Sequence, residues 1–74
     1  MPMPNLHNIS AEDTIKVALK KGYFISRQKG SHIILKDNFG NVLTIPKHKK
    51  LKLGTLLQII KAIGIEKEDF LKLV

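Results

Sequence analysis

Three short runs of β-branched and aromatic residues, separated only by turn-forming residues, constrain the fold more than any other feature of this sequence. The runs cover residues 23–29, 32–36 and 42–45. Gly30 and Ser31 separate the first two, residues 37–41 hold four turn-forming residues around one phenylalanine, and Pro46 ends the third. Strands joined in series by such links form an antiparallel meander, so we expect a three-stranded antiparallel sheet.

A helix is expected before the first strand. Ser10 has the character of an N-cap, and Asp13, three residues later, completes a variant of the capping box. The expected apolar face consists of Ala11, Ile15, Ala18 and Leu19. Val17 lies outside this stripe, and Gly22 can adopt the left-handed conformation that ends a helix.

The clearest helical pattern follows the third strand. Its apolar residues recur at i, i+3, i+4 and i+7, and they are Leu56, Ile59, Ile60 and Ile63. Thr55 and Gln58 have the spacing of a capping box, and Gly64 is a suitable end. Residues 66–73 predict a further short helix packed under the sheet. This order, α-β-β-β-α with a trailing helix, predicts an α+β fold whose helices cover one face of the sheet and leave the other open.

The small size of the chain limits its core. We expect residues 1–74 to form a single domain in which residues 1–8, with two prolines and no periodicity, are frayed. The sequence has no cysteine, so disulfides and thiolate metal sites cannot compensate, and a stable complex with a partner is plausible from size alone. It holds neither a membrane-spanning apolar run nor a signal-peptide pattern, which predicts a cytoplasmic protein.

The charge is strongly positive and concentrated in the middle of the chain. Lysine and arginine total 13 against 6 acidic residues, a net charge of +7. Between Thr14 and Lys61 the only acid is Asp37. Such a basic segment is typical of proteins that bind nucleic-acid phosphates, although an acidic protein partner or simple solubility also fits it.

A histidine follows the turn between the first two strands, in the sequence Gly30-Ser31-His32, where a hairpin alone would need only glycine and a polar neighbour. Together with the segments 45–48 (IPKH) and 54–56 (GTL), this motif resembles the HicA family of bacterial type II toxin–antitoxin systems over residues 14–73. The resemblance implies a double-stranded-RNA-binding-domain-like fold, mRNA cleavage and neutralisation by a HicB antitoxin. It also implies that His32 is the catalytic residue.

The chemistry of RNA cleavage without a metal agrees with that role. The reaction needs a group that takes the proton of the ribose 2′-hydroxyl, a group that protonates the leaving 5′-oxygen, and positive charge near the phosphate. Histidine suits proton transfer because its ordinary pKa of roughly 6.5 lies near the operating pH. Lys29 or Lys36 can assist the phosphate charge, Gly30 permits close approach to the backbone, and Ser31 can hydrogen-bond a phosphate or orient the imidazole.

The second group of candidate RNA-binding residues lies in the loop after Pro46. It comprises Lys47, His48, Lys49, Lys50 and Lys52. His48 is a candidate for the second proton-transfer group, but contact with a phosphate or plain exposure to solvent is the stronger reading. His7 falls in the segment expected to be frayed, and no function is expected of it. The three histidines lack the spacing and companion ligands of a zinc site, so we expect neither a metal nor another cofactor.

Several alternatives stay open at this level. A non-catalytic double-stranded-RNA-binding module would use the same lysines and only a hydrogen bond from His32. A protein-interaction domain would use the basic surface for an acidic partner.

The aromatic residues are expected in the core or in turn packing rather than as stacking platforms for bases; they are Tyr23, Phe24, Phe39 and Phe70. Alternation places His32, Ile34 and Lys36 on one strand face and Ile33 and Leu35 on the other, but it does not decide which face is buried.

Overall fold

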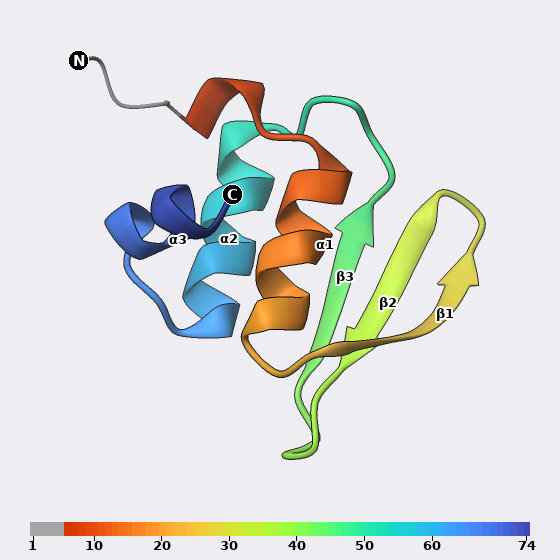
Figure 1. Ribbon diagram of the computed structural model, residues 1–74. Helices are drawn as coiled ribbons and strands as arrows, with labels where there is room; N and C mark the ends of the chain where they lie inside the picture. The colour runs from red at the N-terminus through yellow and green to blue at the C-terminus, as the bar shows by residue number, and fades with distance from the viewer. Residues whose placement is uncertain (1–5) are drawn as a thin grey trace.

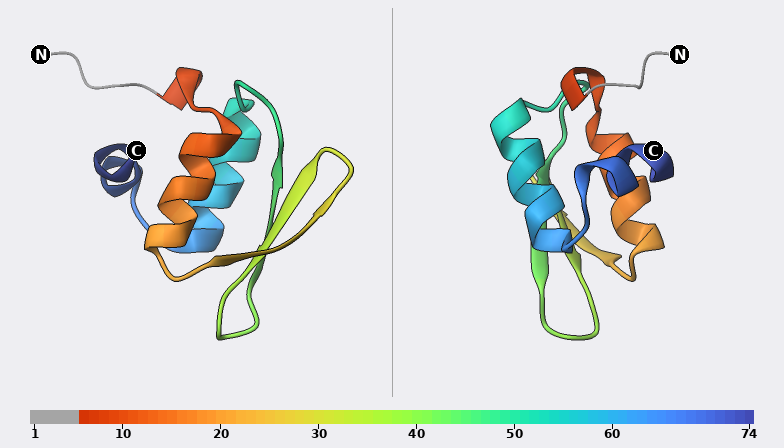
Figure 2. Two further views of the ribbon diagram at one scale, coloured as in Figure 1. Left: turned by 45° about the vertical axis from the view of Figure 1, so that its right-hand side comes forward. Right: turned by 90° about the vertical axis from the view of Figure 1, so that its left-hand side faces the viewer.

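A computed structural model describes residues 6–74, which form a sheet layer covered on one side by helices (Figure 1). Along the chain the elements are η1 (Leu6–Asn8), α1 (Ala11–Lys20), β1 (Phe24–Lys29), β2 (His32–Lys36), β3 (Val42–Pro46), α2 (Leu53–Ile63) and α3 (Lys67–Leu73). Helices α1 and α2 lie side by side on one face of the sheet, and the opposite face is open (Figures 1 and 2). The predicted α+β, double-stranded-RNA-binding-domain-like fold is confirmed, with α3 as its trailing helix.

The sheet is the predicted antiparallel meander, in the order β1-β2-β3. The two-residue link between β1 and β2 pairs Lys29 with His32, and β2 continues against β3 with His32 opposite Pro46. A bulge between Ile25 and Arg27 shifts the register of β1. Every residue of β1 is exposed, so β1 forms an edge of the sheet that the helices do not cover.

Burial on β2 decides which face of this strand meets the helices. Ile33 and Leu35 are buried, whereas His32 and Lys36 are exposed and Ile34 is half-buried. On β3, Leu43 and Ile45 complete the buried side. The alternation that the sequence left open is therefore settled, and His32 lies on the open face.

Helix α1 begins as predicted, but its buried face differs from the expected one. The backbone N–H of Asp13 donates to Ser10 Oγ at 3.1 Å, and Ser10 N–H donates to the Asp13 carboxylate at 3.2 Å, which closes the capping box. Val17 is completely buried, whereas Leu19 is 47% exposed, so the predicted stripe was wrong at both positions. The buried arc is centred on Thr14, whose hydroxyl donates to Ser10 O at 2.9 Å and so tolerates burial. Because the polar Thr14 lies at its centre, the buried face of α1 could not be recognised from the apolar pattern of the sequence.

Helix α2 begins earlier than predicted. Its N-cap is Lys52, and no side chain of the described residues caps it, so the proposed Thr55 and Gln58 capping box was wrong. Thr55 instead lies in the first turn. The expected end is confirmed, because Gly64 adopts φ 85° in the left-handed region.

The two ends of the described chain pack against helices rather than against the sheet. Helix α3 lies on the side of α1 and α2 that faces away from the strands, with Phe70 fully buried, which corrects the expectation that it packs under the sheet (Figures 1 and 2). Residues 6–8 form η1, and Leu6 packs against the core. Residues 1–5 and the side chain of His7 lie outside the described part of the chain.

The aromatic residues divide between the core and the surface. Tyr23 and Phe70 are buried as expected, but Phe24 and Phe39 are 47% and 90% exposed, so the expectation was wrong for these two. Phe24 lies on the uncovered edge strand. Phe39 lies in the β2–β3 turn, where Asp37 accepts hydrogen bonds from the backbone of Phe39 and from the backbone and side chain of Asn41 at 2.8–2.9 Å. The hydrogen bonds from Asn41 and Phe39 hold the pKa of Asp37 below its ordinary value.

Candidate active site

The turn that carries His32 has a defined backbone geometry. Gly30 adopts φ 59°, in the left-handed region. The side-chain amide of Gln28 donates a hydrogen bond to the backbone carbonyl of Gly30 at 3.2 Å. A Cβ built on Gly30 would meet no atom of the described chain within 4 Å, so backbone conformation rather than space favours glycine there. The turn therefore holds Lys29, Ser31 and His32 exposed at one end of the sheet.

The same turn is joined to the basic loop by the backbone. The N–H of Lys47 donates to the carbonyl of Ser31 at 2.6 Å, which extends the β2–β3 ladder beyond Pro46. Further along, the carbonyl of His48 accepts from the N–H of Ala11 at 2.9 Å, and Leu51 N–H donates to the carbonyl of Ile9 at 2.8 Å. The loop of residues 47–52 is thus anchored at three points, and the buried Leu51 side chain fixes its far end.

Anchoring of the loop creates a groove beside His32. Six residues line this groove, which we call the His32 groove: His32, Pro46, His48, Leu51, Lys52 and Thr55. Its volume is about 360 Å³. The first turn of α2 reaches it through Thr55 and contains no acidic residue, so the positive end of the helix dipole adds to the charge of Lys52. Two imidazoles, one ammonium and one hydroxyl therefore surround a space with positive potential.

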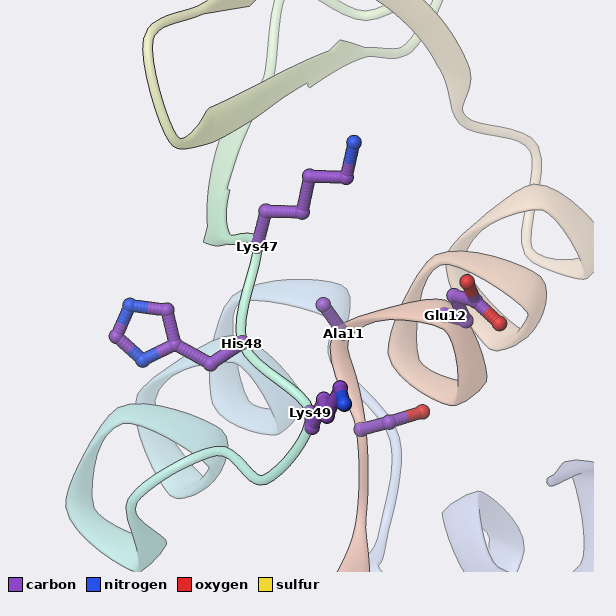
Figure 3. Close-up of a pocket in the computed structure, with 6 residues that line it drawn as sticks. Ala11, Glu12, Lys47, His48 and Lys49 are labelled. Carbon is purple, nitrogen blue, oxygen red and sulfur yellow. The ribbon is translucent and has the colours of Figure 1, made fainter.

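A second pocket lies on the other side of the basic loop (Figure 3). Its lining consists of Ser10, Ala11, Glu12, Lys47, His48 and Lys49, and its volume is about 530 Å³. The ring of His48 points away from Ala11 and Glu12 in this view. This pocket includes the carboxylate of Glu12, which repels phosphate, and it lacks His32.

The register of the sheet separates the lysines predicted to assist His32. Lys29 is the direct cross-strand partner of His32, so both side chains lie on the open face at the same end of the sheet. Lys36 shares this face but lies four residues along β2, roughly 13 Å away at the usual rise of a strand. Lys29 is therefore placed beside His32, and Lys36 is not.

The structure brings together only part of the predicted set. His32, His48 and Lys52 share the groove, with Lys29, Gly30 and Ser31 in the adjacent turn, and Lys47 and Lys49 line the second pocket. Lys50 is exposed in the loop but lines neither pocket. Sequence reasoning missed Thr55 as a groove residue, because its hydroxyl had been interpreted as a helix cap.

Residues 6–74 contain no group of three histidine, cysteine or acidic side chains arranged to hold a metal ion. Within the same residues, none of the helices combines the length and the apolar composition needed to cross a membrane.

Comparison with known protein families decides the classification. The sequence model of the family described as "HicA toxin of bacterial toxin-antitoxin" matches residues 11–65, well over half of the chain. The chain belongs to the HicA toxin family. The match begins with α1 and ends just after α2, so it includes the turn of His32, the basic loop and the His32 groove. A search among curated proteins returned no match. As a member of the HicA toxin family, the protein is a toxin of a bacterial toxin–antitoxin system.

Proposed function

We propose that this HicA-family toxin is a metal-independent endoribonuclease that cleaves mRNA, with His32 as a proton-transfer residue. The observation that carries the proposal is the position of His32, exposed on the open face of the sheet and lining a groove with Lys52 and the first turn of α2. Positive charge beside an accessible imidazole suits proton transfer next to a phosphate, because it stabilises the negative charge that develops there. Membership of the HicA toxin family supports the same activity.

The reaction follows from the groups in the groove. His32 takes the proton of the ribose 2′-hydroxyl, the 2′-oxygen forms a bond to phosphorus, and the bond from phosphorus to the 5′-oxygen breaks. Lys52, helped by Lys29 from the neighbouring strand, stabilises the negative charge on the non-bridging oxygens as the phosphorus becomes five-coordinate. The products are a 2′,3′-cyclic phosphate and a 5′-hydroxyl.

Binding of the RNA strand relies on the lysines around the groove. Lys47, Lys49 and Lys50 extend the positive surface along the basic loop, and Gly30 and Ser31 offer backbone and hydroxyl groups at the turn. Lysine acts as a point charge and does not form bidentate contacts with phosphate, so these residues supply affinity without sequence preference. Because mRNA is the substrate, we place the reaction in the cytoplasm.

The test compares wild-type protein with His32→Ala on a labelled messenger-like RNA in the presence of EDTA, with cleavage and binding measured separately. The side chain of His32 is exposed, so its removal should leave the fold intact, as circular dichroism can check. Cleavage should fall by about 10²–10⁴-fold while binding is retained, as expected for loss of a general base. Salt-sensitive binding by a wild type that does not cleave would instead establish a non-catalytic double-stranded-RNA-binding module.

We further propose that a HicB-type antitoxin neutralises the toxin by covering His32. Support comes from the basic surface around the groove and from the exposed apolar side chains of the uncovered strand, Phe24 and Ile25, which together fit an acidic partner with an apolar contact. In the same assay, addition of the antitoxin should abolish both cleavage and RNA binding. RNA that still binds at His32 in the complex would contradict occlusion.

A further inference from the structure

The proposed reaction leaves one requirement unmet. When the bond to the 5′-oxygen breaks, an alkoxide leaves, and a general acid must protonate it for the step to be fast at neutral pH. His32 cannot supply this proton in the same step, because it is accepting the proton of the 2′-hydroxyl. A second proton donor is therefore needed within reach of the same phosphate.

Among the residues that line the His32 groove, His48 suits this role best, because an imidazole transfers protons near neutral pH more readily than the ammonium group of a lysine does. His48 lines the groove together with His32, although 15 intervening residues separate the two in the sequence. They approach from different elements, since His32 begins β2 and His48 belongs to the loop that follows β3. In-line displacement places the attacking and leaving oxygens on opposite sides of phosphorus, so an acid and a base borne by different elements suit this geometry.

His48 holds the loop through its backbone and not through its side chain. Its hydrogen bonds within residues 6–74 use the backbone: the carbonyl accepts from Ala11 N–H at 2.9 Å, and the N–H donates to the carbonyl of Pro46 at 2.8 Å. The ring is exposed and points away from Ala11 and Glu12 on α1 (Figure 3). The loop is therefore held without the imidazole, which stays available to a ligand in the groove.

We propose that His48 is the second catalytic residue of this toxin and protonates the leaving 5′-oxygen while His32 accepts the proton of the 2′-hydroxyl. One proton enters the protein at His32 and one leaves it at His48, so the step is balanced without a metal or another reactant. Lys52 and Thr55, which line the same groove, lie in position to contact the non-bridging oxygens. This inference rests on the proposed ribonuclease activity and adds to it the identity of the acid.

A sulfur substitution in the substrate tests the role of His48 directly. An RNA with one scissile linkage is prepared in two forms, with the ordinary 5′-oxygen or with a bridging 5′-sulfur. A thiolate is a far better leaving group than an alkoxide, because a thiol has a pKa of about 8.5 and needs no acid to depart. Wild type, His48→Ala and His32→Ala are compared on both substrates, with Lys49→Ala as the control from the same loop, since Lys49 does not line the His32 groove.

On the oxygen substrate, His48→Ala should cleave about 10²–10⁴-fold more slowly than wild type, with binding retained. On the sulfur substrate it should approach the wild-type rate, whereas His32→Ala should stay impaired on both. Lys49→Ala should show no difference between the two linkages, because the removed ammonium group takes no part in proton transfer.

Other outcomes overturn the inference in distinguishable ways. If wild type cleaves and His48→Ala cleaves the oxygen substrate equally fast, His48 has no catalytic role and the proposed function stands without it. If His48→Ala is equally impaired on both linkages, His48 does not act as the general acid. If sulfur restores cleavage only for His32→Ala, then His32 rather than His48 is the general acid. If wild type cleaves neither substrate, the proposed ribonuclease activity fails and this inference fails with it.

Discussion

At the scale of single residues, the site depends on which side chains the strand pairing brings next to His32. Lys29 is its cross-strand partner, whereas Lys36 lies on the same face roughly 13 Å further along β2. That separation exceeds the Debye length of about 8 Å at physiological salt, so the charge of Lys36 is largely screened from the groove. From the sequence alone, both lysines were equal candidates to assist at the phosphate, because strand register cannot be derived from proximity along the chain.

This difference predicts unequal effects of the two lysines on cleavage. Lys29→Ala should lower kcat/KM by about tenfold, equivalent to roughly 1.4 kcal/mol of transition-state stabilisation, and Lys36→Ala should change it by less than about twofold. Both variants remove one exposed charge from the sheet, so each is a control for the other. Equal losses in a steady-state assay would mean that the open face acts only through its total charge.

At the scale of elements, local rules predicted those features that depend on neighbouring residues. The capping box of α1, the two-residue turn at Gly30 and the end of α2 at Gly64 are determined by side chains or backbone angles within a few residues. The start of α2 was not predictable in this way, because its N-cap is a lysine whose side chain makes no capping bond within the described chain. The His32 groove was also beyond sequence reasoning, since it depends on backbone bonds from the basic loop to Ser31, Ala11 and Ile9.

The two glycines nearest the site should respond oppositely to the same substitution. Gly30 has φ 59°, so Gly30→Ala should destabilise the fold by about 1–2 kcal/mol, the cost of a left-handed conformation for an L-residue. Gly54 lies in the first turn of α2 without a positive φ, and a Cβ there would meet no described atom within 4 Å, so Gly54→Ala should stabilise by about 0.4–1 kcal/mol. Chemical denaturation measures both, and destabilisation by Gly54→Ala would contradict the assignment of α2.

At the scale of the whole molecule, the two faces of the sheet differ, because the helices cover one of them and leave the other open (Figure 2). One face of the sheet meets α1 and α2 through buried residues of β2 and β3, and the other carries His32 beside the basic loop. The fold class could be predicted because the order of elements and the turns leave few arrangements for a meander with two flanking helices. Which face is open could not, because the run from Ile33 to Leu35 is apolar on both sides.

We propose that the open face cleaves RNA by attack of the 2′-hydroxyl without a metal, and the chemistry of the product ends tests this proposal most directly. Purified toxin is incubated with a defined RNA in EDTA, and the fragments are analysed by mass spectrometry, with His32→Ala as the control for contaminating ribonucleases. The proposed mechanism predicts 2′,3′-cyclic phosphate and 5′-hydroxyl ends that are absent with His32→Ala. Fragments with 5′-phosphate and 3′-hydroxyl ends, or cleavage that appears only after Mg²⁺ is added, would contradict it.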